Sequence, residues 1–260
     1  MRRSILAVAL STALVTTPSA WAASDTAPAT APDTAAQGST GQGSTGQGST
    51  SKDSAGKGSA VPSAGDLLFE QPQMKNTAPG STLTYDYSRR SGIERGPYGP
   101  PLNDTIKFMI EPGKSAESRD IRVQMFSGGN RVPAGPFNDM PGNPVLSLFL
   151  ENHLKGLAGL LEANPRYIKN AIRKGLREKA TVTPTQVTFK GRTLEGFRVE
   201  MQPFLGDPLT ERMRGFETTT YTFVVAPEVP GEIVSLQART LKPDGGELLE
   251  ERLDYDQKDS

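Results

Sequence analysis

The stretch TTTYTFVVAPEVPGEIVSLQARTLKPDGGELLEERLDY, residues 218–255, decides the fold class. Apolar and polar residues alternate through 218–225, 233–241 and 248–255, and this alternation is the period of a β-strand. The runs are separated by PEVPG and PDGG, and clusters of proline and glycine of this kind mark turns. Three strands joined by short turns predict an antiparallel meander.

The same alternation recurs upstream, so the meander is part of a larger sheet. Five further strands are predicted at 83–87, 106–110, 121–125, 187–189 and 194–201. A helical pattern replaces the alternation between the third and fourth of all these runs. The sequence therefore predicts an α+β fold, a mostly antiparallel and curved sheet of about eight strands, half-barrel-like, with two inserted helices at 144–163 and 165–179.

The starts of the two helices carry clear local signals. Asn143-Pro144 and Asn164-Pro165 each place a capping side chain before a proline, whose fixed φ suits the first turn of a helix. Asp207-Pro208 repeats the pattern and predicts a shorter helix over 209–215.

The first inserted helix is more apolar than a surface helix needs to be. One interpretation is that it covers the curved sheet and lines a cavity for an apolar ligand. In that case the lining residues are Leu146, Phe149, Leu150, Leu154 and Leu157. The alternative is that this helix fills the concave face of the sheet as ordinary core.

The second inserted helix is amphipathic and strongly basic. Its exposed faces are predicted to carry Arg166, Lys169, Arg173, Lys174 and Arg177. These cations are candidates for contact with anionic headgroups or with a protein partner. The alternative is that they form a solvated face with no binding role.

The strand order over 83–255, with helices inserted at 145–179, resembles the periplasmic lipoprotein carriers of the LolA and LolB type and related half-barrel proteins. This resemblance implies a hydrophobic cavity for lipid-like ligands. It involves no diagnostic motif, so it implies no functional residue. Those carriers open with a helix packed on the sheet, whereas residues 66–81 carry only a weak helical pattern broken by two prolines.

The N-terminus predicts export. Arg2 and Arg3 precede an apolar run at 5–15, and small residues at Ala20 and Ala22 suit cleavage before Ala23. We therefore expect a signal peptide at 1–22 on the general secretory route, with the twin-arginine route and an uncleaved anchor as the alternatives. Residues 23–64, rich in Ser, Thr, Gly and Gln, predict a disordered tether. Residues 66–258 are expected to form a single β-rich domain, and the product is expected to be periplasmic or secreted, without a transmembrane segment after cleavage.

Composition excludes several classes of protein. The chain has no cysteine, which rules out disulfides, thiolate metal sites and a lipid-modified cysteine. Its 29 basic and 29 acidic residues balance, and loss of Arg2 and Arg3 leaves 27 basic residues and a net charge of about −2. We therefore expect no nucleic-acid partner.

The inventory of catalytic residues is short. His153 is the single histidine, and its place at the edge of an apolar stripe favours a hydrogen-bonded packing role over a general base. The carboxylates of Asp86, Asp207 and Glu211 leave a carboxylate-based hydrolase as a minor alternative. No catalytic residue, metal or cofactor is predicted, and we expect a protein that is not an enzyme.

Two functions remain open from the sequence. The first is an exported, non-catalytic binding module for a lipid-like or amphipathic ligand. The second is a structural or protein-interaction module of the cell envelope, tethered by its flexible arm and binding through a surface patch.

Overall fold

The computed structural model describes residues 61–92 and 100–258. The predicted signal peptide, 1–22, and nearly all of the predicted tether, 23–64, lie outside the described residues. Both therefore stay predictions.

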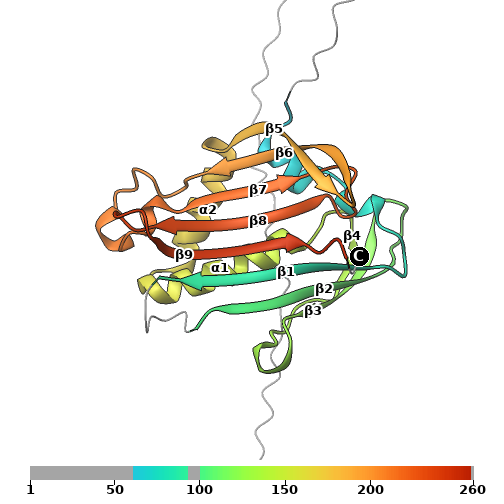
Figure 1. The fold of residues 1–260 in the computed structure, drawn as a ribbon, viewed down its shortest axis with the longest axis horizontal. Coiled ribbons are helices and arrows are strands. Elements are labelled where there is room, and N and C mark those ends of the chain that lie inside the picture. The colour runs from blue at the N-terminus through green and yellow to red at the C-terminus, as the bar shows by residue number, and fades with distance from the viewer. Residues whose placement is uncertain (1–60, 93–99, 259–260) are drawn as a thin grey trace, which may run out of the picture. The chain divides into compact units, whose positions relative to one another are not determined.

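One antiparallel sheet runs through the described residues, in the spatial order β4-β3-β2-β1-β9-β8-β7-β6-β5 (Figure 1). Its strands are β1 (Thr82–Ser91), β2 (Leu102–Pro112), β3 (Arg119–Met125), β4 (Phe137–Met140), β5 (Thr181–Phe189), β6 (Arg192–Met201), β7 (Thr220–Val225), β8 (Ile233–Leu241) and β9 (Glu247–Tyr255). Strands β4 and β5 are its two edges and do not pair with each other, so the sheet is open. The predicted α+β, half-barrel-like fold is confirmed.

Strands β1 and β9 lie side by side in the middle of the sheet, although they are far apart in sequence. Tyr85 pairs with Tyr255, and Arg90 pairs with Glu250. Strands β1 to β4 form one meander and β5 to β9 form a second. The segment between β4 and β5 carries α1 (Val145–Leu161) and α2 (Pro165–Glu178), and both helices lie behind the same face of the sheet (Figure 1).

The strands turn apolar side chains toward the helices and polar side chains away from them. On β7 and β8, Tyr221, Phe223 and Leu236 are fully buried. Gln237 and Arg239, at alternate positions on β8, are half-buried and exposed. This alternation follows from the two-residue period of a strand. The core therefore lies between the sheet and the two helices.

Both helices begin where the Asn-Pro pairs predict. The Asn143 side-chain oxygen accepts a hydrogen bond from the Val145 backbone N–H at 3.0 Å, and that of Asn164 accepts one from the Arg166 N–H at 2.9 Å. These bonds satisfy backbone donors that the first turn leaves unpaired. Helix α1 ends at Leu161 because Glu162 adopts a left-handed conformation with φ 51°.

The prediction of a short helix over 209–215 is wrong. Asp207 does cap this segment, since its carboxylate accepts from the Leu209 N–H at 2.8 Å. The segment then forms only a single 3₁₀ turn, Thr210–Met213. Arg214 with φ 52° and Gly215 with φ 94° take left-handed conformations, and these stop the helix.

The sheet has nine strands rather than eight, and the additional strand is β4. Its four residues carry no clear alternation, and it pairs with β3 through an irregular register. Strand β5 also begins earlier than predicted, at Thr181. The early part of β5 contains Pro184 and few apolar residues, a composition that an edge strand tolerates.

A buried arginine fastens the segment before β1 to β3. The guanidinium of Arg119 donates hydrogen bonds to the backbone carbonyls of Thr77, Lys75, Ala116 and Ser118, at distances of 2.7 to 3.1 Å. The Arg119 residue is only 7% exposed. One side chain therefore satisfies four carbonyl groups of irregular backbone.

Candidate functional site

The predicted cavity-lining residues of α1 lie against the sheet. Their exposed fractions are small: Leu146 2%, Phe149 1%, Leu150 0%, Leu154 4% and Leu157 0%. So little accessible surface leaves no room for a ligand beside them while α1 is in place. In this conformation the helix itself fills the concave face of the sheet.

A hydrogen-bonded polar cluster joins α1 to three central strands. The His153 ring on α1 contacts the Glu251 carboxylate of β9 through Nδ1 and the Tyr221 hydroxyl of β7 through Nε2, each at 3.0 Å. The Tyr87 hydroxyl of β1 donates to the other Glu251 oxygen at 2.7 Å. The predicted packing role of His153 is confirmed, since both ring nitrogens are satisfied within the core.

The cluster holds Glu251 in its charged form. Burial by itself raises the pKa of this carboxyl, but the charge and hydrogen bond of His153, the hydrogen bond from Tyr87 and the charge of Arg89 outweigh burial. The net pKa of Glu251 therefore lies below its ordinary value. Burial, together with the Glu251 charge, raises the pKa of the Tyr87 hydroxyl, so Tyr87 stays protonated and donates.

Helix α2 presents its basic residues outward and its aliphatic residues inward. Ile168 and Ile172 are fully buried, while Arg166 and Arg177 are exposed. At 100° per residue, Arg166, Arg173 and Arg177 lie within about 40° of one another around the helix. We call these three residues the arginine stripe.

The five predicted cations of α2 differ in their partners. Lys169 forms an ion pair with Glu151 of α1 at 2.9 Å, and Lys174 lies 3.8 Å from Glu178. None of the three arginines of the stripe forms an ion pair with another described residue. Among the cations of α2, the charge available to an outside ligand is therefore concentrated on the arginine stripe.

The loop at 203–209 runs beside α2, and sequence reasoning missed it as part of the site. The Lys179 ammonium, just after α2, donates to the carbonyls of Pro203 at 3.3 Å and Leu205 at 3.0 Å. The Tyr167 hydroxyl, in the first turn of α2, donates to the Asp207 carboxylate. Partial burial, that hydrogen bond and the charge of Asp207 raise the pKa of Tyr167 to about 12. Two contacts therefore hold the loop against α2.

The same loop exposes two large apolar side chains. Leu205 is 55% exposed and Leu209 is 39% exposed. A signal was present in the sequence, because both leucines stand among Gly206, Asp207 and Pro208, which mark a surface turn rather than core. The arginine stripe of α2 and this loop, which Tyr167 and Lys179 attach to the same helix, are the candidate site.

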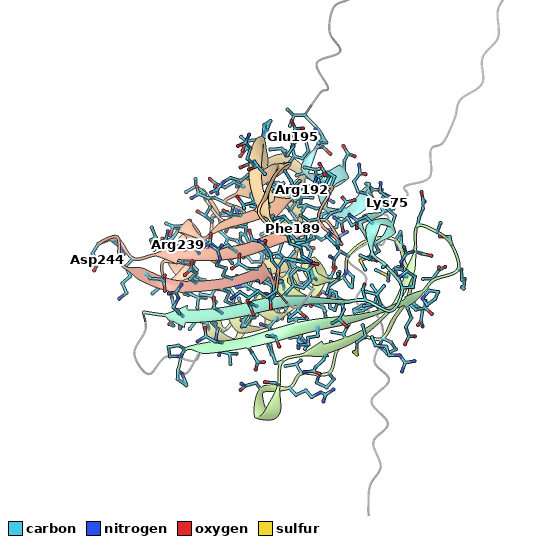
Figure 2. The ribbon with its side chains drawn as sticks, turned by 45° about the vertical axis from the view of Figure 1, so that its right-hand side comes forward. Lys75, Phe189, Arg192, Glu195, Arg239 and Asp244 are labelled. Atoms are coloured by element: carbon cyan, nitrogen blue, oxygen red, sulfur yellow. The ribbon has the colours of Figure 1, made fainter. Side chains whose placement is uncertain are left out.

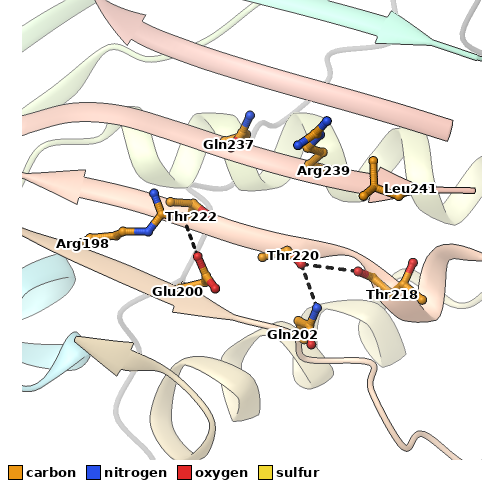
Figure 3. A pocket seen from close by; sticks show the side chains of 9 residues that line it. All are labelled: Arg198, Glu200, Gln202, Thr218, Thr220, Thr222, Gln237, Arg239 and Leu241. Carbon is orange, nitrogen blue, oxygen red and sulfur yellow. Dashed lines mark hydrogen bonds and ion pairs between the residues drawn. The ribbon is translucent and has the colours of Figure 1, made fainter. Parts of the chain in front are cut away.

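A shallow polar hollow of about 300 Å³ lies on the other face of the sheet, over β6, β7 and β8 (Figure 3). It is lined by Arg198, Glu200, Gln202, Thr218, Thr220, Thr222, Gln237, Arg239 and Leu241. Arg198 and Glu200 form an ion pair, with a guanidinium nitrogen 2.6 Å from a carboxylate oxygen, so their charges cancel. Arg239 lies toward the end of the sheet that carries Asp244, whereas Lys75 lies at the opposite end (Figure 2). This hollow contains no buried polar group without a partner, so it carries no functional assignment.

A second hollow, of about 580 Å³, lies beside the edge strand β5. Pro184, Phe197 and Pro227 contribute to its walls. None of the five α1 residues predicted to bind ligand lines this hollow or the one over β6 to β8.

The structure separates the carboxylates of the hydrolase alternative. Asp86 lies on β1, whereas Asp207 and Glu211 follow β6. Strands β9, β8 and β7 lie between β1 and β6, which is roughly 19 Å along the sheet at the usual strand spacing. Asp86 therefore does not converge with the other two.

Residues 61–92 and 100–258 contain neither a metal-binding cluster nor a helix that could span a membrane. In these ranges no group of three or more His, Asp or Glu side chains is arranged to hold a metal ion. No helix in the same ranges is long and apolar enough to cross a membrane.

Comparison with known proteins assigns no family. No family model matches the chain. No curated protein matches it either. Among solved structures, the crystal structure of the Mycobacterium tuberculosis lipoprotein LppX is similar over 71% of this chain and 90% of that chain, at 7% sequence identity and a TM-score of 0.29. At these values the likeness assigns no function to this chain.

Proposed function

We propose that the protein is a non-catalytic binding module for an anionic amphipathic ligand, whose headgroup contacts the exposed face of α2. The observation that carries the proposal is the arginine stripe, three guanidinium groups in line with no ion-pair partner among the described residues. A guanidinium offers a planar fork of donors that matches the oxygens of a phosphate. The paired Lys169 and Lys174 flank the stripe and contribute less.

The apolar part of such a ligand has no preformed place beside α1. The five predicted side chains there are at most 4% exposed. We therefore propose that headgroup binding at α2 comes first. A ligand would reach Leu146, Phe149, Leu150, Leu154 and Leu157 only by displacing α1 from the sheet.

The test is binding to lipid vesicles at low and high salt. We expect the protein to bind phosphatidylglycerol vesicles and not phosphatidylcholine vesicles, with affinity falling as salt rises. Basic side chains near an anionic surface contribute about 1 kcal/mol each. The triple variant Arg166→Gln, Arg173→Gln, Arg177→Gln should therefore bind about a hundredfold more weakly.

A matched control removes three arginines that lie outside α2. Arg131, Arg192 and Arg239 are all exposed. Their replacement by Gln changes the net charge by the same amount, so binding should weaken by no more than about threefold. Equal losses in the two triple variants, or no vesicle binding by the unaltered chain, would contradict the proposal.

We also propose that the protein works in the periplasm or outside the cell. The support is the sequence pattern of residues 1–22, with its two arginines, apolar run and small residues before Ala23. N-terminal sequencing of the protein secreted by an expressing bacterium should find Ala23 as the first residue. An N-terminus at Met1 in a cytoplasmic fraction would overturn this part of the proposal.

A further inference from the structure

The loop at 203–209 indicates which kind of ligand the site binds, because it exposes large apolar side chains. Six large apolar side chains among the described residues are exposed: Val61, Phe69, Met109, Leu205, Leu209 and Leu241. Two of the six stand four positions apart on this loop. Single exposed leucines are ordinary on a protein surface, but these two stand on one short loop that Tyr167 and Lys179 attach to the cationic helix α2.

We infer that Leu205 and Leu209 insert between the headgroups of an anionic bilayer, while the arginine stripe of α2 contacts the phosphates around them. This inference rests on the proposed function and narrows the ligand to a membrane surface. A free phosphate or sugar phosphate would engage the arginines and leave the leucines in water. An apolar phase next to anionic headgroups satisfies both sets of side chains at once.

The attachment of the loop suits insertion. Lys179 holds the Leu205 carbonyl from the end of α2, and Tyr167 holds Asp207 from its start. Asp207 in turn accepts from the Leu209 backbone N–H. The leucines are therefore presented on a backbone already attached to α2, and insertion need not order a mobile segment first.

Charge complementarity favours lipid over a protein partner. The segment from Arg166 to Lys179 carries six basic residues and one acidic residue, Glu178. Glu178 is already matched with Lys174. The α2 segment therefore carries a net charge of about +5, and a bilayer rich in anionic headgroups matches that sign along the helix.

An introduced tryptophan measures insertion directly. Trp21 is the only tryptophan of the chain and lies in the predicted signal peptide, so the mature chain from Ala23 is a tryptophan-free background, in which one substitution leaves a single indole. We expect Leu205→Trp in this background to show a blue-shifted emission with phosphatidylglycerol vesicles and no shift with phosphatidylcholine vesicles or inorganic phosphate. Leu209→Trp is a second probe of the same loop. The control is Leu241→Trp, on the far face of the sheet and 38% exposed, whose emission should stay unchanged.

The role of the leucines is separable from that of the arginines. We expect Leu205→Ser with Leu209→Ser to weaken vesicle binding by at least tenfold, with the salt dependence retained. Binding with no spectral shift at either loop position would overturn insertion and leave the proposed function standing. Absence of vesicle binding would overturn both, and binding of inorganic phosphate as tight as that of vesicles would assign the arginines to a soluble anion instead.

Discussion

Nδ1 of His153 on α1 lies 3.0 Å from the Glu251 carboxylate on β9, and both residues are at most 2% exposed. The same carboxylate accepts from Tyr87, and the same ring contacts Tyr221. A helix that otherwise packs through leucines is thus fixed in one position along the sheet by directional bonds. Such bonds add specificity, because a helix shifted by one turn would leave these groups buried and unpaired.

Removal of either partner of this pair should destabilise the protein. His153→Ala leaves the Glu251 carboxylate buried without its ring partner, and loss of one member of a buried pair costs about 3 to 5 kcal/mol. Urea denaturation measures the free energy of unfolding. Arg198→Ala, at the exposed pair with Glu200, is the control and should cost no more than about 1 kcal/mol. Similar costs for the buried and exposed variants would show that the cluster does not stabilise the fold.

The free energy of unfolding should fall in acid, partly because the Glu251 carboxylate becomes protonated. Its pKa in the folded protein is lowered, so between that value and the unfolded value of about 4.3 the unfolded chain binds more protons. The stabilisation is fully present above the unfolded pKa and is lost as pH falls through the folded pKa.

The Glu251→Gln variant isolates this contribution. The difference in unfolding free energy between wild type and variant should shrink as pH falls from 7 toward the folded pKa. Burial raises the pKa values of Glu232 and Glu247, which therefore act in the opposite direction, but both groups are present in both proteins. A difference that stays constant from neutral pH to acid would contradict the expectation.

Replacing each of two helical glycines by alanine should change the stability of the protein in opposite directions. A Cβ at Gly159 of α1 would meet nothing within 4 Å, so Gly159→Ala should stabilise the protein by about 1 kcal/mol through helix propensity. A Cβ at Gly175 of α2 would lie 2.7 Å from Cβ of Pro203, so Gly175→Ala should destabilise it by about 1 to 3 kcal/mol. Thermal unfolding measures both changes, and a Gly175→Ala variant at least as stable as the wild type would refute the packing of α2 on Pro203.

Arg119 should not be replaceable by lysine. A lysine ammonium cannot span the four carbonyls that the guanidinium joins, so Arg119→Lys should cost about 2 kcal/mol. Hydrogen exchange should rise in the segment around Thr77, where the guanidinium is bound. Arg122→Lys, at an exposed neighbouring position of β3, is the matched control. Unchanged exchange around Thr77 would argue against the anchoring role.

Local patterns predicted much of the fold. The alternation over 218–255 locates β7, β8 and β9 to within two residues, and Asn143 and Asn164 locate the starts of both helices. Strand β4 could not be found in this way, because its pairing with β3 is decided by tertiary context rather than by its own four residues. The pairing of β1 with β9 likewise has no local signature.

The candidate site was predictable only in part. The basic face of α2 follows from helical periodicity, but the partners of its cations do not. Lys169 is paired with Glu151, a residue 18 positions away on another helix. Leu205 and Leu209 join the site because Lys179 and Tyr167 draw the loop to α2. Such contacts depend on the packed tertiary structure, and sequence spacing alone does not encode them.

The central position of β9 also governs the order in which the molecule can be assembled. Tyr87 and its partner Glu251 are 164 residues apart, so the half of the sheet built from β1 to β4 is synthesised long before its neighbour exists. Until β9 is available, β1 and β8 are additional open edges, and open edges are where chains pair wrongly with one another. The nine residues Glu247–Tyr255 of β9 therefore complete the sheet by pairing with both of these edges. The chain stays vulnerable to aggregation until they are in place.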